Sequence, residues 1–227
     1  MRTVPYHVEE LRVALNARDP QHIVPTLPAG CRTVLDLGCG AGQTILGLRH
    51  ELPESASVRF IGIDIDPEAL RAANELQISG AFLRASGDRL PIADHSVDFV
   101  FSRVALPYMH IPRAVAEIHR VLRPGGSVWI SLHRPRRVMI WLKEAILQGH
   151  WKAALAQSFS LISGTMLLLT NRQTRMPVTG RYLTFQTPEG MRKLVEKAGF
   201  QVTSSALEPF FVLQATKPAP KAARSGR

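Results

Sequence analysis

Three glycines at alternate positions, Gly38, Gly40 and Gly42, follow a short apolar run that ends at Leu37. Glycine has no Cβ and tolerates positive φ angles, so such a strand-to-helix turn lets the backbone approach a ligand closely. Asp36 lies at the end of the strand, where a purely structural parallel strand favours Val or Ile. The segment therefore predicts a cofactor site, with a dinucleotide and S-adenosylmethionine as the two candidates.

The chemistry around the turn separates these two cofactors. A dinucleotide fingerprint requires a third glycine where this chain has Gln43. A sulfonium cofactor carries a positive sulfur and an amino group, so an acidic turn suits it better. The run Val34–Gly42 resembles the first motif of the class I S-adenosylmethionine-dependent methyltransferases. This resemblance implies that S-adenosyl-L-methionine is the cofactor and that the turn supplies its contacts: Asp36, Gly38, Cys39, Gly40, Gly42 and Gln43.

A second acidic strand end follows at Asp64, 24 positions after Gly40. A carboxylate at the carboxyl end of the neighbouring strand can accept hydrogen bonds from both ribose hydroxyls of an adenosine. By resemblance, Asp64 is the ribose ligand with Ile65 beside it, while Asp66 caps the helix that begins at Pro67. A dehydrogenase binds ribose in the same way, so this acid alone does not separate the two classes.

The stretch Ser86–Pro91 resembles the methyltransferase segment that binds adenine. Many relatives carry an aspartate at the position of Ser86, and the resemblance assigns Gly87 and Asp88 to the small residue and the second acid that follow it. Either the Ser86 hydroxyl makes the adenine contact, or Asp88 takes that role. After the next strand, Ser102 and Arg103 are expected at the amino-acid end of the cofactor, where an arginine can pair with a carboxylate.

Methyl transfer is an in-line displacement to which an enzyme contributes largely by positioning the reactants. A general base is needed only when the acceptor must lose a proton. The candidates for this catalytic role are Tyr108, His110 and His133, although each also suits a structural role as a packed aromatic, a helix-entry residue or a strand end. No spacing typical of a zinc site occurs in the sequence, and no metal is expected.

Short apolar strands alternate with helical stretches from residue 33 onward, which predicts a parallel sheet covered by helices on both faces. The strands are expected at 33–37, 58–64, 81–84, 97–101, 127–132, 201–207 and 210–216. By resemblance, the fold is a Rossmann-like α/β domain with a seven-stranded, mostly parallel sheet whose last strand is antiparallel. The Glu117–Gly126 run matches a family signature with an architectural role.

Five segments follow from these patterns. Residues 134–181 interrupt the alternation with two apolar helical stretches, and they hold eight basic residues against one acid, so they carry most of the chain's net charge of +10. The expected segments are an N-terminal helical segment (1–30), the S-adenosylmethionine-binding core (31–133), a basic apolar helical cap insertion (134–181), the C-terminal part of the core (182–216) and a disordered basic tail (217–227).

These features predict a methyltransferase that acts on a small acceptor of lipophilic or partly anionic character. The basic cap and tail leave two alternatives open: an RNA methyltransferase, whose binding would depend on salt, and a non-catalytic cofactor-binding or membrane-associated module. The free thiols expected of Cys31 and Cys39 and the lack of a signal-peptide pattern predict a cytoplasmic location. The cap also predicts peripheral contact with an anionic membrane.

Overall fold

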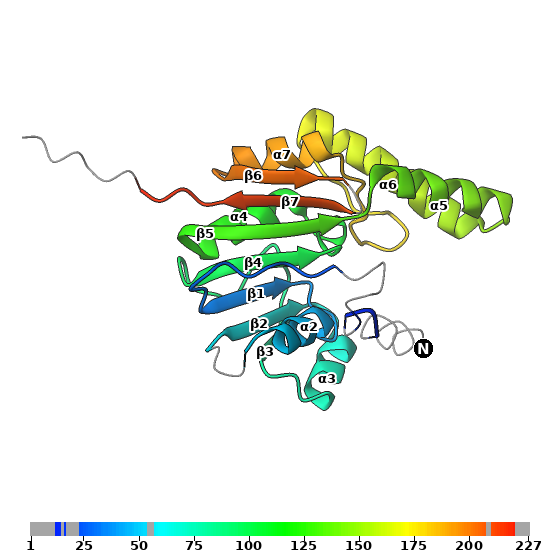
Figure 1. Cartoon of the computed structure of the whole chain (residues 1–227). Helices are drawn as coiled ribbons and strands as arrows, with labels where there is room; N and C mark the ends of the chain where they lie inside the picture. The colour runs from blue at the N-terminus through cyan, green and yellow to red at the C-terminus, as the bar shows by residue number, and fades with distance from the viewer. Residues whose placement is uncertain (1–11, 15, 17–22, 54–56, 208–209, 221–227) are drawn as a thin grey trace, which may run out of the picture.

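The computed structural model describes residues 12–14, 16, 23–53, 57–207 and 210–220, which form an α/β domain (Figure 1). The N-terminal helical segment expected over 1–30 and the tail from 221 onward lie largely or wholly outside these residues. The described strands form one seven-stranded sheet in the order β3-β2-β1-β4-β5-β7-β6. β1 to β5 are parallel, and β7 runs antiparallel to both of its neighbours. The Rossmann-like sheet predicted from the sequence is confirmed.

The elements follow the predicted alternation of strand and helix. In chain order they are β1 (Thr33–Leu37), α2 (Gln43–Glu51), β2 (Arg59–Asp64), α3 (Pro67–Glu75), β3 (Ala81–Arg84), β4 (Val97–Arg103), the 3-10 turn η1 (Leu106–Tyr108), α4 (Ile111–Val121), β5 (Leu122–Leu132), α5 (Pro135–Leu147), α6 (Trp151–Thr170), α7 (Pro188–Lys197), β6 (Gln201–Ala206) and β7 (Phe211–Thr216).

Each face of the sheet buries its own core, because successive side chains of a strand point to opposite faces. In β1, Leu35 packs with the buried faces of α4 and α7, whereas Val34 packs with α2 and with Phe60 and Phe101. The helix α4 contributes buried side chains at 111, 114, 115 and 118, the spacing of one helical face. These two cores fix the strand ends on which the candidate site is built.

The helices α5 and α6 form an antiparallel pair that projects from the edge of the sheet where the parallel strands end (Figure 1). They lie within the segment for which a helical cap was predicted. Only Val138 and Ala145 are buried in α5, and only Ser160, Ser163, Gly164 and Leu167 in α6. Most residues of this pair are therefore exposed or only half-buried, although each helix is largely apolar.

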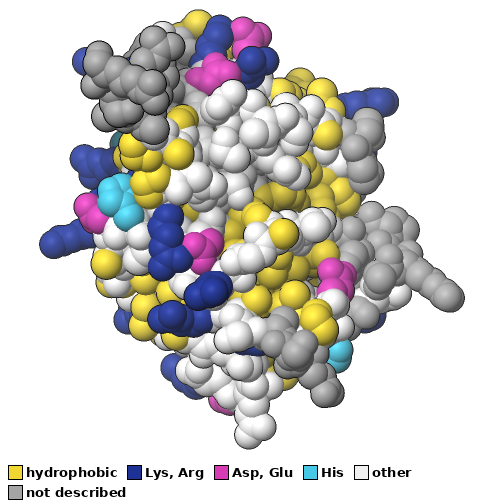
Figure 2. Space-filling model, turned by 60° about the vertical axis from the view of Figure 1, so that its left-hand side comes forward, with side chains coloured by type: hydrophobic (Ala, Val, Ile, Leu, Met, Phe, Trp, Pro, Cys, Tyr) yellow, Lys and Arg dark blue, Asp and Glu magenta, His cyan; other side chains and the backbone are white. Residues whose placement is uncertain are grey.

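The opposite edge of the sheet, where the parallel strands begin, carries charges of both signs among hydrophobic side chains (Figure 2). Arg123 forms an ion pair with Asp98 at the start of β4, and Asp98 also accepts hydrogen bonds from the N–H groups of Arg32 and Thr33. Arg120 pairs with Asp94 and Glu117 in the same region. These polar contacts tie the beginnings of neighbouring elements together.

Several strand boundaries differ from the sequence prediction, and the largest difference is in β5. β5 begins at Leu122 and not at Ser127, because Gly125 and Gly126 exchange backbone hydrogen bonds with Lys217 and so extend the sheet. Lys217, which the composition assigned to the disordered tail, is buried. Its ammonium group donates to the carbonyls of His119 and Leu122 and contacts Nδ1 of His95. A cation at these carbonyls satisfies acceptors that the end of α4 leaves unpaired.

We expect Lys217→Ala to lower the free energy of unfolding by about 2 kcal/mol, because it removes a charged donor from the carbonyls of His119 and Leu122, of which, within the described structure, only Leu122 keeps a contact, with Nδ1 of His95. Urea denaturation followed by circular dichroism measures this change. Lys193→Ala is the matched control, since Lys193 is exposed and pairs only with Glu189 at the surface, and it should change stability little. Equal stability of both variants would show that the Lys217 contacts contribute nothing measurable.

Candidate functional site

The candidate site is a cleft at the carboxyl ends of the parallel strands. It lies beside β1, where the order of the strands changes direction: β2 and β3 lie on one side of β1, and β4 and β5 on the other. Two lobes of about 310 and 580 Å³ share Gly38, Asp64, Ala105 and Tyr108 in their walls. The smaller lobe lies over the glycine turn, and the larger one extends over the segment 85–88. The cleft is therefore one elongated site.

The glycine turn is held by backbone hydrogen bonds to the end of β2. The N–H groups of Gly38 and Cys39 donate to the carbonyl of Ile63 at 2.8 and 3.1 Å. Gly38 has φ of 81°, and a Cβ there would collide with the side chain of Ala105. Gly42 adopts a left-handed conformation at the start of α2. The turn therefore needs glycine at positions 38 and 42 for their positive φ angles, and at position 38 also because Ala105, in the loop after β4, lies so close.

The carboxylate of Asp64 connects the turn to the neighbouring strand. Its Oδ2 accepts from the N–H of Gly40 at 2.8 Å, and its Oδ1 accepts from the N–H of Asp66 at 3.0 Å. Each carboxylate oxygen has a second lone pair, so both can still accept hydrogen bonds from a ligand. Asp64 lines both lobes of the cleft, and Ile65 lines the larger one. Asp66 caps α3 by accepting from the N–H of Glu68, as predicted.

Asp36 is almost fully buried beneath the turn, and its Oδ2 has no hydrogen-bond partner. Burial raises the pKa of this carboxyl well above its ordinary value, the charge of Asp64 raises it further, and Arg103 opposes the shift. Arg103 itself lines the smaller lobe together with Gln43. Two carboxyl groups and one arginine thus lie near the glycine turn. A positively charged group of a ligand there would offset the second negative charge.

The segment predicted to bind adenine lies in the wall of the larger lobe. The Ser86 hydroxyl donates to the Asp88 carboxylate, so the two residues that were alternatives for the adenine contact form one pair. Gly87 is buried, and a Cβ there would lie 2.5 Å from the sulfur of Met109. Two residues after Asp88, Leu90 donates its N–H to the carboxylate of Glu117 in α4 at 2.7 Å, and this bond holds the segment against the helix.

The three candidate catalytic residues all reach the cleft. Tyr108 lines both lobes, His110 the larger and His133 the smaller. His110 also caps α4, because its Nδ1 accepts from the N–H of Arg113 at 3.3 Å, and burial together with Arg113 lowers its pKa. The His133 ring packs edge-on against Trp141 of α5. Each residue thus has a structural contact as well as a place in the cleft.

The structure does not bring every predicted residue to the cavity. Ser102 is fully buried, its hydroxyl donates to the carbonyl of Leu37 at 2.8 Å, and it lines neither lobe, so the cavity walls give its predicted cofactor contact no support. Asp36 and Gly42 lie beneath the wall and shape it. The remaining predicted cofactor residues line the cleft directly: Gly38, Cys39, Gly40, Gln43, Asp64, Ile65, Ser86, Gly87, Asp88 and Arg103.

The residues that close the larger lobe from the cap side lie outside the motifs recognised in the sequence, and of them only Tyr182 was a candidate, as a more distant general base. The Tyr182 ring packs edge-on against His110 and lies under the guanidinium of Arg175. Both residues, with Arg181, lie in the wall of that lobe. These residues sit in an irregular segment between α6 and α7, where no periodicity or motif points toward the site.

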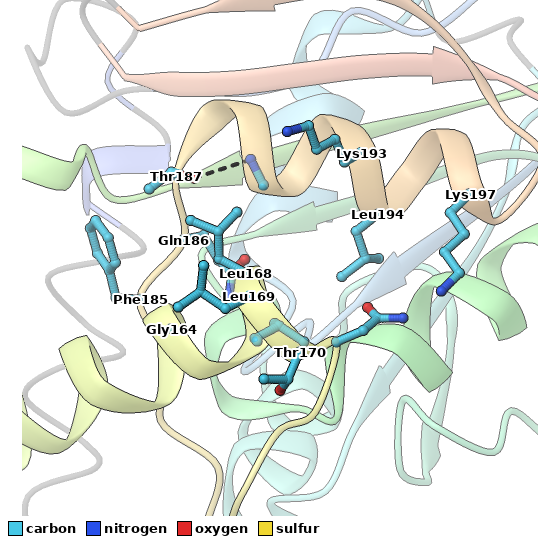
Figure 3. Close-up of a pocket in the computed structure, with 13 residues that line it drawn as sticks. Gly164, Leu168, Leu169, Thr170, Phe185, Gln186, Thr187, Lys193, Leu194 and Lys197 are labelled. Atoms are coloured by element: carbon cyan, nitrogen blue, oxygen red, sulfur yellow. Dashed lines mark hydrogen bonds between the residues drawn. The ribbon is translucent and has the colours of Figure 1, made fainter.

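Two further cavities adjoin α6. A small inner cavity of about 50 Å³ shares Tyr108 and His133 with the cleft and reaches beneath the helix pair. The α6–α7 cavity, of about 260 Å³, lies between the end of α6 and α7, with Leu168 and Leu169 on one side and Lys193, Leu194 and Lys197 on the other (Figure 3). Gln186 lines both, and its buried amide nitrogen has no hydrogen-bond partner.

We expect Asp36→Asn to stabilise the protein without its ligand at pH 8 more than at pH 5. The pKa of Asp36 is raised by folding, so the folded state binds the proton more tightly and the wild type loses stability as pH rises through this window. Asparagine removes the titration. Thermal unfolding at several pH values measures the difference between the two proteins, and a difference that does not grow with pH would contradict the expectation.

The amino-acid sequence is similar to those of known methyltransferases over the part of the chain that forms this site. Residues 35–130 match the model of a methyltransferase domain. An uncharacterized methyltransferase of Mycobacterium sp. (strain KMS) is 36% identical over 112 residues, which are 49% of this chain and 42% of that protein. A malonyl-[acyl-carrier protein] O-methyltransferase of Hahella chejuensis is 36% identical over 106 residues, covering 45% and 37%. The match spans less than half the length of either relative.

Solved structures agree on the fold over a larger part of the chain. A putative methyltransferase of Haloferax volcanii, in complex with the Trm112 methyltransferase activator, is 20% identical with a TM-score of 0.63 and covers 97% of this chain and 93% of its own. The matched residues 35–130 run from β1 through β4 to β5 and include both the glycine turn and Asp64. Residues 35–130 therefore match a methyltransferase domain, and the solved structures share its fold over nearly the whole chain.

Proposed function

We propose that this chain is an S-adenosylmethionine-dependent methyltransferase that acts on a small lipophilic or partly anionic acceptor. The observation that carries the proposal is the Asp64 carboxylate, which is fixed by two N–H groups at the switch point of the sheet and faces both lobes of the cleft. The matched methyltransferase domain supports the same cofactor.

The residues of the cleft fit the parts of this cofactor. Asp64 would accept the ribose hydroxyls, and Gly87, Ser86 and Asp88 would line the adenine. Asp36, whose Oδ2 lacks a partner, and the glycine turn would surround the amino-acid end, with Arg103 near the carboxylate. When bound, the cofactor supplies an electrophilic methyl group on a sulfonium. The chain's own part is to align the acceptor, exclude water and, where required, remove a proton.

We propose that a small apolar group of the acceptor enters the inner cavity, which at about 50 Å³ holds only part of a molecule and shares Tyr108 and His133 with the smaller lobe. Its walls are apolar at Leu132, Val138 and Trp141, so they favour a lipophilic group. The unpartnered Gln186 amide would donate a hydrogen bond to an oxygen of the acceptor. His133 and Tyr108 lie where this cavity meets the smaller lobe, so either could serve as general base. The basic segment 134–181 supports an acceptor with a negative group.

We expect Asp64→Asn to weaken binding of S-adenosylmethionine at least about tenfold, because it removes the charge from a hydrogen-bond acceptor of the ribose. Isothermal titration calorimetry measures the affinity. Glu68→Gln is the matched control, since it removes a carboxylate charge from the exposed first turn of α3 and Glu68 lines neither lobe of the cleft. Unchanged affinity of the Asp64 variant would contradict the assignment of the ribose site.

The activity itself is tested by incubating the protein with radiolabelled S-adenosylmethionine and a fractionated cell extract. We expect label in the solvent-extractable, small-molecule fraction. Label in RNA would instead favour the nucleic-acid alternative, and cofactor binding without any transfer would favour a non-catalytic module.

Gln186→Leu then tests the acceptor site separately from the cofactor site. It removes a buried donor that has no partner in the described structure, so stability should be kept or raised. Transfer of label to the identified acceptor should fall about tenfold, while affinity for S-adenosylmethionine stays unchanged. Full turnover by this variant would exclude Gln186 from acceptor binding.

A further inference from the structure

The helix α6 has its large apolar residues on the outside. Trp151, Leu155, Ile162 and Leu169 are 68, 50, 66 and 76% exposed. At 3.6 residues per turn these four side chains lie within about 40° of one another around the helix axis, along about 27 Å of its length. We call this row the α6 stripe. A surface helix of a globular protein shows the reverse arrangement, with its apolar residues toward the core.

The opposite side of α6 holds the helix to the protein through mostly small residues. Ser160, Ser163, Gly164 and Leu167 are the buried positions. A Cβ on Gly164 would collide with the carbonyl of Phe185, and Ser163 lies 3.3 Å from the hydroxyl of Thr184. The Ser160 carbonyl also accepts from the N–H of Phe185 at 3.0 Å. This close attachment fixes which side of the helix faces outward.

Positive charge flanks the α6 stripe at both ends. At the N-terminal end Lys152 follows Trp151, and its ammonium lies 5.4 Å from the centre of the indole ring. At the C-terminal end Leu169 lines the α6–α7 cavity together with Lys197 of α7 (Figure 3). Lys193 lines the same cavity, but its ammonium pairs with Glu189. A long apolar row between cationic groups matches the layering of an anionic bilayer, in which acyl chains lie beneath negative headgroups.

The turn between α5 and α6 extends this surface. All residues from Ile146 to Ala153 are exposed, among them Leu147 at 74%. Among the described helices, α6 is the one long and apolar enough to cross a membrane by length and composition. Its buried side, however, is bonded to the segment 184–185, so insertion across a bilayer would break these contacts. Binding along the membrane surface keeps them.

We propose that α6 is a membrane-docking helix, which lies in the plane of an anionic lipid surface with the α6 stripe and the 146–151 turn among the acyl chains. This inference is independent of the proposed methyl transfer. A second copy of the chain is the other occupant that this row of side chains suits, and the oligomeric state tests it below.

Vesicle flotation of the full chain tests the proposal. We expect binding to phosphatidylcholine vesicles that contain phosphatidylglycerol, and weaker binding to phosphatidylcholine alone or at high salt. Leu155→Glu/Ile162→Glu should reduce partitioning about tenfold or more. Leu76→Glu/Leu83→Glu is the matched control, since these residues are exposed apolar side chains outside α6, and it should bind like the wild type. Thermal unfolding shows whether each variant is folded.

Two further measurements distinguish the occupants of this surface. Brominated lipids should quench the fluorescence of the wild type more than that of Trp151→Phe, because Trp151 enters the lipid. Analytical ultracentrifugation without lipid follows the oligomeric state. Absence of vesicle binding by the wild type, or equal binding by the α6 and control variants, would overturn the proposal. A wild-type dimer that Leu155→Glu/Ile162→Glu dissociates, without vesicle binding, would assign the stripe to a second copy.

Discussion

The hydrogen bond from the N–H of Gly40 to the carboxylate of Asp64 is the constraint on which the cleft depends. It joins the turn after β1 to the end of β2, and the N–H groups of Gly38 and Cys39 add two bonds to Ile63 beside it. On its other side the turn lies against Ala105, and only a glycine at position 38 leaves room for that side chain. One carboxylate therefore shapes the loop and presents its remaining lone pairs to a ligand.

The sheet and the cofactor side of the cleft were readable from the sequence because both depend on local signals. Alternating apolar runs identify the strands, and a parallel sheet brings their carboxyl ends to one edge. The sequence alone therefore predicts that Asp64, Gly87 and Arg103 lie at the same edge, where they line the cleft. Ser102 shows the limit of this reasoning. It neighbours Arg103 in sequence, but consecutive strand residues face opposite sides, and its hydroxyl bonds to Leu37.

The cap side of the cleft could not be predicted in the same way. Tyr182, Arg175 and Gln186 reach their cavities from irregular backbone, and their positions are set by contacts far apart in sequence, such as those of Gln173 with Met109 and Thr184. Lys217 illustrates a related limit, because composition alone cannot distinguish a solvated lysine from one whose ammonium caps buried carbonyls. The orientation of α6 about its axis could not be predicted from the sequence either, because in a helix that is apolar on all sides the composition does not show which side packs against the protein.

Gln173 connects the two parts of the molecule that bear on function. Its amide donates to the carbonyl of Met109 and to the hydroxyl of Thr184, and its oxygen accepts from the N–H of Ile111. The loop that carries Tyr108 is thus bonded to the segment on which α6 rests, and Thr184 adds a bond to Pro107. This bridge is the hydrogen-bonded connection through which the position of α6 and the occupancy of the cleft would be coupled. If a ligand in the cleft binds more tightly to one position of the bridge, it changes the affinity of α6 for its own partner. By linkage, that partner changes the affinity of the cleft for the ligand by the same factor.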